Sequence, residues 1–339
     1  MSNEEILTDF NKLYKAFLTS KNRRTYTKSS MQYSLNAVSN LRKLQKELQN
    51  KTYKVSGYTE FEVTVPKKRK IKACHFKDKI VQHVLCDNIL CKELKNICIR
   101  QNYAGQVGKG TSAALNDLKD NLQRYASRYG QSGYIYRGDI SKYYYNISHQ
   151  EAKDIMMYHY PEDVHWLIKE FIDSTEGTKE IALGNQINTV VSNLYLDGFD
   201  KFITGELGIE YYGRYADDFY LIHPSKEYLK YCEYCIKEFL ATLQLTLNPK
   251  SQLIPVKNGI SFLGFHLYIR EEGVKIKKDN GKARAYRRKF NRLCKKVREG
   301  SMEYEKLCKS YESWKEHASF CTETKIFNYY ERKLKELRK

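Results

Sequence analysis

The run Tyr211–Ile222 constrains the fold of this chain more than any other stretch. Its sequence, YYGRYADDFYLI, places Asp217 and Asp218 between two short apolar and aromatic segments. Such segments on either side of a turn predict a β-hairpin with the acid pair at its tip. Two adjacent carboxylates there are unfavourable unless a cation compensates them, and oxygen ligands favour a hard ion such as Mg²⁺. A plain Asp-Asp turn is the alternative, and other stretches of the chain decide between the two.

A further acid, Asp139, ends another predicted strand, the segment YIYRGD at residues 134–139. If this strand lies beside the hairpin in one antiparallel sheet, Asp139, Asp217 and Asp218 together supply the carboxylates that two metal ions need. Two such ions stabilise both the attacking and the leaving oxygen of an in-line phosphoryl displacement. The pattern therefore predicts a two-metal site for phosphoryl transfer.

The composition indicates a folded protein with a polyanionic partner. A hydrophobic content of 41% indicates a folded chain, and 339 residues are enough for one large domain or two to three subdomains. Lysine and arginine number 59 against 40 acidic residues, and the net charge of +19 is spread along the chain. An anionic membrane could also attract this charge, but no apolar run reaches the roughly 18 residues of a spanning helix.

Cysteine usage and the N-terminus predict a cytoplasmic protein. The nine cysteines are an odd number without framework spacing, and the N-terminus lacks the features of a signal peptide. Cys232 and Cys235 have the spacing of half a zinc site, but no second pair completes it. We interpret them as structural cysteines in a helix.

The acidic run resembles the YxDD box of reverse transcriptases, and the surrounding residues match that family in order from about Thr52 to Tyr268. The resemblance is to bacterial enzymes of the group II intron-like, diversity-generating and defence-associated lineages. It implies an α+β right-hand polymerase with an antiparallel-sheet palm, fingers and a small helical thumb. The expected divisions are residues 1–133 for N-terminal helices and fingers, 134–268 for the palm with parts of the fingers interleaved, and 269–339 for the thumb.

For the chemistry, the resemblance implies two Mg²⁺ ions, with Mn²⁺ as a substitute. Asp139, Asp217 and Asp218 become catalytic metal ligands, with Ile140 as a further ligand at the same site. Lys250 lies where the family has a lysine that acts as general acid toward the leaving pyrophosphate, and a protonated amine suits that task. A surface lysine is the alternative.

The resemblance also implies residues that bind the incoming dNTP. A basic hairpin at residues 58–75 resembles the fingers hairpin, in which Arg69 and then Lys67 are candidates to hold the triphosphate. Tyr144 corresponds to an aromatic that blocks a 2′-hydroxyl and so selects dNTPs, with core packing as its alternative. Gly184 and Asn185 fall in the nucleotide- and template-positioning segment. That segment departs from the family pattern at Leu183, Asn188 and Thr189.

Nucleic-acid contacts are implied in four other places. They are a helix resembling the family's Arg-Asp-Arg-Ile-Val-Gln stretch, a glycine-rich loop ahead of a helix that Thr111 could cap, a hairpin resembling the primer grip, and the basic tail. The residues concerned are Lys77, Lys79, Lys109, Gly110, Phe262, Leu263, Gly264, Arg287, Arg288 and Lys295.

Periodicity predicts amphipathic helices at residues 6–17, 35–48, 76–90, 149–173 and 225–243, a long helix before residue 200, and a helical tail from Lys277. An Asn-Gly pair predicts a hairpin turn at residues 256–260.

The expected partners are template RNA, nascent cDNA and dNTPs, with an accessory protein or a second copy of the chain as further possibilities. Two biological settings remain open. One is a defence-associated enzyme that copies a dedicated non-coding RNA, and the other is a diversity-generating enzyme; a retron enzyme ranks third. A polymerase-like scaffold that binds RNA without catalysis is the alternative from a different class, and the three retained acids argue against it.

Overall fold

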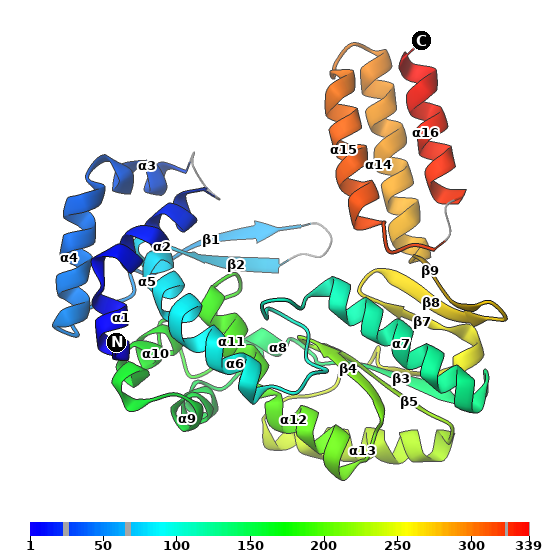
Figure 1. Ribbon diagram of the computed structural model, residues 1–339, viewed down its shortest axis with the longest axis horizontal. Coiled ribbons are helices and arrows are strands. Elements are labelled where there is room, and N and C mark those ends of the chain that lie inside the picture. The colour runs from blue at the N-terminus through cyan, green and yellow to red at the C-terminus, as the bar shows by residue number, and fades with distance from the viewer. Residues whose placement is uncertain (23–26, 65–68, 323–324, 339) are drawn as a thin grey trace.

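The computed structural model describes residues 1–22, 27–64, 69–322 and 325–338, and it combines helices with antiparallel sheets (Figure 1). The N-terminal helices gather at one side of the molecule, beside a two-stranded hairpin. The elements of this part are α1 Asn3–Thr8, α2 Phe10–Asn22, α3 Lys28–Leu35, α4 Ala37–Gln49, β1 Tyr58–Val63, β2 Arg69–Cys74, α5 Phe76–Leu85, the π-helical turn η1 Cys86–Leu90 and α6 Cys91–Ile97. The hairpin predicted at residues 58–75 is therefore present, with Tyr58 opposite Cys74.

The remaining helices of the main body are α7 Thr111–Tyr129, α8 Tyr143–Asn146, α9 His149–His159, α10 His165–Ile172, α11 Gln186–Tyr195, α12 Asp197–Lys201 and α13 Lys226–Thr242, with short turns η2 Glu162–Val164 and η3 Phe202–Glu206. No helix within the described ranges combines the length and the apolar character that crossing a bilayer requires.

Several predicted helices are interrupted, each at a residue with an identifiable backbone effect. The first predicted helix divides at Asp9, whose backbone is extended and whose carboxylate accepts a hydrogen bond from the Lys12 N–H at 2.9 Å. This is how a side chain caps a new helix. The helix predicted for 149–173 stops at Tyr160, because Pro161 disfavours helical geometry in the residue before it. The long helix before residue 200 begins at Gln186 and divides at Leu196 (φ −109°, ψ 12°).

The central sheet has four antiparallel strands in the order β4-β5-β3-β6. Their bounds are β3 Tyr134–Asp139, β4 Tyr211–Tyr215, β5 Asp218–His223 and β6 Gln252–Pro255. Both of its faces are buried. Tyr136 and Phe219 face a cluster that includes α13, while Ile135 and Tyr220 face a second cluster that includes α7. Because both faces contact helices, the strands are almost continuously apolar and aromatic instead of alternating with polar residues.

A second, three-stranded sheet joins the main body to a C-terminal helical bundle. Its strands are β7 Ile260–Phe262, β8 Phe265–Arg270 and β9 Gly273–Lys278, and the bundle is formed by α14 Asn280–Arg298, α15 Tyr304–His317 and α16 Lys325–Arg338. The bundle has a core of its own, in which the rings of Tyr286 and Trp314 stack at 4.2 Å. Figure 1 shows the bundle standing off from the main body above this sheet.

The predicted hairpin turn at residues 256–260 is wrong. A 3₁₀ turn, η4 Val256–Asn258, connects β6 to β7, but these strands belong to different sheets. Gly259 follows with φ 69°, and a Cβ there would lie 2.3 Å from the carbonyl oxygen of Leu267. The glycine is therefore needed for the chain to pass from one sheet to the other. The sequence signal correctly marked a tight change of direction, although not the pairing of the strands around it.

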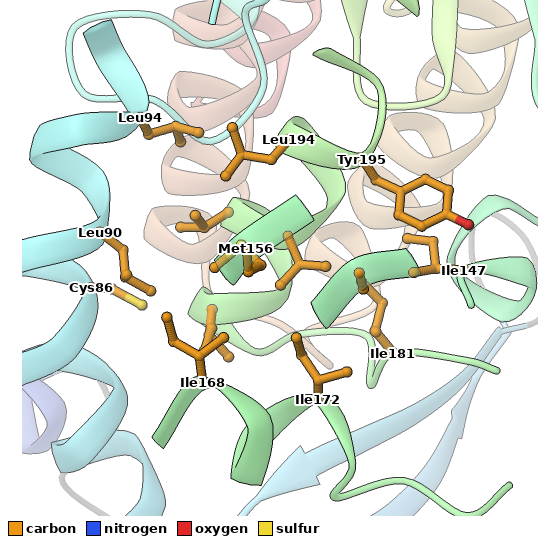
Figure 2. Close-up of a cluster of buried hydrophobic side chains, with 14 of the residues drawn as sticks. Cys86, Leu90, Leu94, Ile147, Met156, Ile168, Ile172, Ile181, Leu194 and Tyr195 are labelled. Carbon is orange, nitrogen blue, oxygen red and sulfur yellow. The ribbon is translucent and has the colours of Figure 1, made fainter. Parts of the chain in front are cut away.

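The larger hydrophobic cluster ties the N-terminal helices to the middle of the chain. In Figure 2, Cys86, Leu90 and Leu94 of the η1–α6 segment face Met156, Ile168 and Leu194 from α9, α10 and α11. All six side chains are at most 2% exposed. Full burial of such side chains stabilises the fold by about 1.5–3 kcal/mol each. This contact holds η1 and α6 against α9, α10 and α11.

Candidate active site

The paired acids lie at the turn between β4 and β5, as the hairpin pattern predicts. Tyr215 and Asp218 are opposite each other in the strand register, and Ala216 and Asp217 form the two-residue turn between them. Ala216 has φ 54°, in the left-handed region that an alanine enters only at an energetic cost. The turn therefore depends on support from the surrounding structure.

Asp139 lies directly beside this turn. It ends β3, and the register pairs it with Asp218 on β5. One carboxylate oxygen from each of Asp139, Asp217 and Asp218 lies within 4.8 Å of the others. The backbone N–H of Ile140 donates to the carbonyl of Asp217 at 3.1 Å, which connects the two acidic segments. Asp139 thus forms one acidic cluster with Asp217 and Asp218, although they lie 78 and 79 positions later in the sequence.

Asn248 and Ser251 orient Asp139 from the segment between α13 and β6. The Asn248 side-chain amide donates to Oδ2 of Asp139 at 2.6 Å, and its backbone N–H donates to the Asp139 carbonyl at 2.7 Å. The hydroxyl of Ser251 accepts from the Asp139 N–H at 3.2 Å. A hydrogen bond to a carboxylate is shorter and stronger than one between neutral groups. The orientation of Asp139 is therefore set by Asn248.

A buried ion pair supports the turn from below. Nε and Nη2 of Arg214 on β4 each donate to one carboxylate oxygen of Asp200 at 2.6 Å, and Nη1 donates to the carbonyl of Ala216 at 3.0 Å. The hydroxyl of Tyr212 also donates to Asp200, at 2.6 Å. Burial lowers the pKa of Arg214, but the carboxylate of Asp200 outweighs it and the pKa is raised overall. The guanidinium is therefore held in its charged form.

A cavity of about 400 Å³ opens beside the acids. Asp217 and Asp218 line it together with Arg69 from β2, Tyr144 from α8 and Leu183. The Tyr144 hydroxyl lies 3.5 Å from Oγ of Ser192, and burial raises its pKa. Basic, aromatic and acidic side chains from three separate parts of the chain thus surround one space.

Comparisons with known proteins identify the family. Residues 28–267 match the family described as reverse transcriptase (RNA-dependent DNA polymerase). The chain belongs to the reverse transcriptase family. No curated protein is significantly similar to the chain in sequence.

Two solved structures similar to this family member are telomerases. One is telomerase from Candida albicans in complex with the TWJ fragment of telomeric RNA, with 13% identity, a TM-score of 0.45, and coverage of 67% of this chain and 47% of that chain. The other is apo telomerase from Candida tropicalis truncated from its C-terminal domain, with 11% identity, a TM-score of 0.51, and coverage of 72% and 60%. The second likeness indicates a shared fold. The chain spans about half to three-fifths of the length of these two structures.

Some of the reverse transcriptase residues predicted to bind dNTP lie at the acids and others do not. Arg69 and Tyr144 line the cavity beside Asp217. Lys67 lies outside the described residues. Gly184 and Asn185 line a different cavity, of about 520 Å³, while their neighbour Leu183 lines this one.

Two lysines predicted to bind nucleic acid have partners within the protein. The Lys109 ammonium donates to the carbonyls of Ile99, Arg100 and Asn102 at 2.8–3.4 Å, so it stabilises the loop after α6. Lys77 donates to Glu47 at 3.3 Å and lies over the ring of Tyr53. Both lysines therefore stabilise the protein's own structure through these contacts.

The other residues around this loop and helix lie as follows. Gly110, with φ 104°, occupies the N-cap position of α7, so Thr111 begins the helix instead of capping it. Lys79 lines the same cavity as Asn185.

The hairpin that resembles the primer grip is a tight two-residue turn between β7 and β8. Leu263 and Gly264 form it with φ 50° and 84°, and both are partly exposed. Phe262 is buried, with its ring packed against Tyr220, so of the three predicted residues only Leu263 and Gly264 are exposed enough to contact a ligand. Leu263 also lines the acidic cavity, which places this turn at the edge of the site.

The remaining predicted cations are exposed. Arg287, Arg288 and Lys295 lie on α14, where Arg287 stacks over Tyr329 at 4.3 Å and Lys295 approaches Glu299 at 3.6 Å. Lys250 is exposed two residues after Asn248, whose side-chain oxygen accepts from the Lys250 N–H.

Proposed function

We propose that this reverse transcriptase family member is an active RNA-directed DNA polymerase that adds dNTPs by two-metal phosphoryl transfer. The observation that carries the proposal is the convergence of Asp139, Asp217 and Asp218, with ligand oxygens within 4.8 Å of one another. Three carboxylates gathered at one point repel each other unless cations compensate them. This arrangement argues against a scaffold that only binds RNA.

The donor set fits a hard divalent ion. Asp139, Asp217 and Asp218 offer only oxygen ligands, and the Ile140 carbonyl is a candidate for another, which favours Mg²⁺, or Mn²⁺ in its place. When bound, such ions neutralise charge on the phosphates and on the attacking oxygen. The chain's own part is to hold the acids still, through Asn248 at Asp139 and Arg214 beneath the turn.

The lining of the acidic cavity supports binding of a deoxynucleoside triphosphate. The Arg69 guanidinium suits phosphate oxygens because it can donate two hydrogen bonds at once. Tyr144 presents a ring beside Asp217, where it would lie against the sugar and exclude a 2′-hydroxyl. Lys250 is the candidate that gives a proton to the leaving pyrophosphate, which its exposed position beyond Asn248 allows.

The architecture suggests how the nucleic acid is held. In this proposal the central sheet with α7 and α13 is the palm, β1–β2 and the N-terminal helices are the fingers, and the α14–α16 bundle is the thumb. The cations exposed on α14 neutralise the phosphates of a template–primer duplex of RNA and nascent cDNA. The partly exposed turn at Leu263 and Gly264 supports a backbone contact to the primer.

A primer-extension assay tests the proposal. The parent should extend a DNA primer on an RNA template with dNTPs and Mg²⁺, and chelation should stop extension. Asp217→Asn should abolish it, whereas Asp154→Asn, a change on the exposed surface of α9, should not. Equal incorporation by Asp217→Asn and the parent would refute the site.

For the biological role, we propose that the enzyme copies a dedicated non-coding RNA in bacterial anti-phage defence, in the cytoplasm. Support comes from the departures at Asn188 and Thr189 from the diversity-generating pattern, and from nine free thiols that suit a reducing compartment.

Sequencing the RNA and DNA that co-purify with the protein tests this role. One recurrent structured RNA supports it, and cDNA rich in substitutions supports a diversity-generating enzyme instead. Size measurement of the same sample shows whether an accessory protein or a second copy is bound.

A further inference from the structure

A polar cluster lies where the three-stranded sheet meets the helical bundle. It consists of Ser261 on β7, His266 on β8 and Asp279, the residue between β9 and α14. All three side chains are partly buried. Ser261 and His266 are opposite each other in the strand register, on either side of the Leu263–Gly264 turn that borders the acidic cavity. We call this set of three residues the junction cluster.

The hydroxyl of Ser261 lies between the other two members of the junction cluster. It donates to Oδ2 of Asp279 at 2.9 Å, and Nδ1 of His266 lies 3.1 Å from the same hydroxyl oxygen. The bond to Asp279 crosses from the sheet to the residue that precedes the bundle. The Ser261 side chain therefore connects two parts of the chain that have separate hydrophobic cores.

Asp279 extends this connection into the first turn of α14. Its Oδ1 accepts from the Gly281 N–H at 3.0 Å, so Asp279 is the N-cap of the helix. Its own N–H donates to the carbonyl of Gly264 at 3.1 Å. Burial alone would raise the pKa of Asp279, but the hydrogen bonds from Ser261 and from the backbone of α14 outweigh it, and the pKa is lowered. The carboxylate is therefore ionised, which strengthens the bond from Ser261.

The backbone of Ser261 is connected to the central sheet. Arg137 lies on β3, two residues before Asp139, and its Nη1 donates to the carbonyl of Ser261 at 3.1 Å. Ser261 thus contacts an acid-bearing strand through its backbone and the start of α14 through its side chain. Both contacts lie within a few residues of the Leu263–Gly264 turn.

The bundle has a second attachment to the same sheet. The N–H of Thr322 donates to the carbonyl of Ile276 on β9 at 2.8 Å, and the Ile276 N–H donates to Oγ1 of Thr322 at 2.9 Å. Loss of the Ser261 hydroxyl should therefore loosen the start of α14 without detaching the bundle.

We propose that Ser261 is a positioning residue that fixes α14 relative to the Leu263–Gly264 turn. The proposal rests on the proposed polymerase function, in which the turn contacts the primer and the cations of α14 contact phosphates of the same duplex. When two contacts to one ligand lie on a rigidly connected pair of elements, the second contact forms at a higher effective concentration. The Ser261–Asp279 bond thereby strengthens the binding of a long duplex without touching it.

Hydrogen exchange of the protein without nucleic acid tests the connection itself. In Ser261→Ala, the backbone amides of Asp279 and Gly281 should exchange about tenfold faster than in the parent, because a hydrogen bond to a charged group is lost. Ser261→Thr keeps the hydroxyl at a partly exposed strand position and should exchange like the parent. The amides of α7 serve as the control and should not change. Equal exchange at Asp279 in Ser261→Ala and the parent would overturn the proposal.

Binding of DNA–RNA duplexes of increasing length, measured by fluorescence anisotropy without dNTP, tests the consequence for nucleic acid. For the parent, affinity should increase once the duplex is long enough to reach α14 from the turn. In Ser261→Ala this increase should be about tenfold smaller, whereas a duplex too short to reach α14 should bind equally well. Ser261→Thr should restore the increase, and Asp217→Asn should retain it.

Three results of the binding experiment would refute the positioning role. They are no increase with length in the parent, an increase of the same size in Ser261→Ala, and failure of Ser261→Thr to restore it. Failure of the proposed polymerase function has a different signature. In that case the parent would show the full increase with duplex length, and its loss in Ser261→Ala, but would extend no primer.

Discussion

Arg214 binds Asp200 through two hydrogen bonds of 2.6 Å while also donating to the carbonyl of Ala216, beside Asp217. Both side chains of this ion pair are 0% exposed. The turn that carries the acids is therefore supported by a charge pair inside the protein. Removing one partner from a buried pair leaves the other charge uncompensated, which destabilises the fold more than removing both partners does.

We predict that Asp200→Asn lowers the free energy of unfolding by about 3–5 kcal/mol and reduces primer extension. Urea denaturation measures the first effect. The double variant Arg214→Met, Asp200→Leu should recover much of the stability, because no charge remains buried. Its extension should stay low, because the bond to the Ala216 carbonyl is still missing. Asp200→Asn with the stability of the parent would contradict this account.

Asn248 should control the rate of incorporation without affecting the binding of nucleic acid. Asn248→Ala removes the 2.6 Å hydrogen bond to Asp139, and a bond to a charged group is worth about 1.5–3 kcal/mol. We expect a single-turnover rate lower by about tenfold or more, with unchanged affinity for primer–template.

Asn248→Asp provides the matched test. An ionised carboxylate at residue 248 cannot donate a hydrogen bond to Asp139 and repels it, so Asn248→Asp should lower the single-turnover rate at least as far as Asn248→Ala does. A rate equal to that of the parent would show that residue 248 does not act on Asp139.

Tyr144 should exclude ribonucleotides by the bulk of its ring. Tyr144→Ala should raise incorporation of rNTPs relative to dNTPs by roughly ten- to hundredfold, because the space beside the sugar opens. Tyr144→Phe should keep the selectivity of the parent, because the hydroxyl makes only a 3.5 Å contact with Ser192. Competition between matched rNTP and dNTP measures the ratio, and loss of selectivity in Tyr144→Phe would rule out a purely steric role.

Lys278 should make stability depend on pH. Burial lowers its pKa from 10.5 to about 8, although the ammonium lies 3.6 Å from the centre of the Phe265 ring. Between these two pKa values the unfolded chain binds a proton that the folded chain has released, so stability rises with pH. The parent should therefore gain stability relative to Lys278→Met as pH increases from about 8 to 10, with no relative gain below about pH 7. Parallel stability curves across this range would disprove the effect.

The sequence predicts the three acids of the site more completely than it predicts the residues that hold their turn in place. Asp139 and Asp218 end or begin strands whose aromatic residues are buried on both faces, so pattern alone predicted both strands and the turn. Arg214 was missed, although a charged residue in the middle of a buried strand is itself a signal that a buried partner exists. Nothing local marks Asp200 as that partner, because the pairing depends on how α12 packs under β4.

Other errors have the same origin in long-range packing. The Asn258-Gly259 pair specified a tight turn, but which strands it connects depends on the separation of β6 and β7 into two sheets. Lys109 has the sequence context of a phosphate ligand, yet its ammonium donates to backbone carbonyls of the loop that follows α6. The predicted helical tail begins at Lys277, inside β9, because the lysine-rich sequence of this strand gives little β signal and its pairing with β8 provides the order.

The burial of both faces of the central sheet limits the directions from which a substrate can arrive. Helices α7 and α13 close off the broad sides, so among the described residues the acids are accessible from the ends of β3 and β5. Asp139 and Asp218 lie at the ends of neighbouring strands and opposite each other in the register, so a substitution that shifts β3 against β5 would change the spacing of the two carboxylates. The packing of α7 and α13 on the sheet therefore sets the geometry of the acids as well as the stability of the fold.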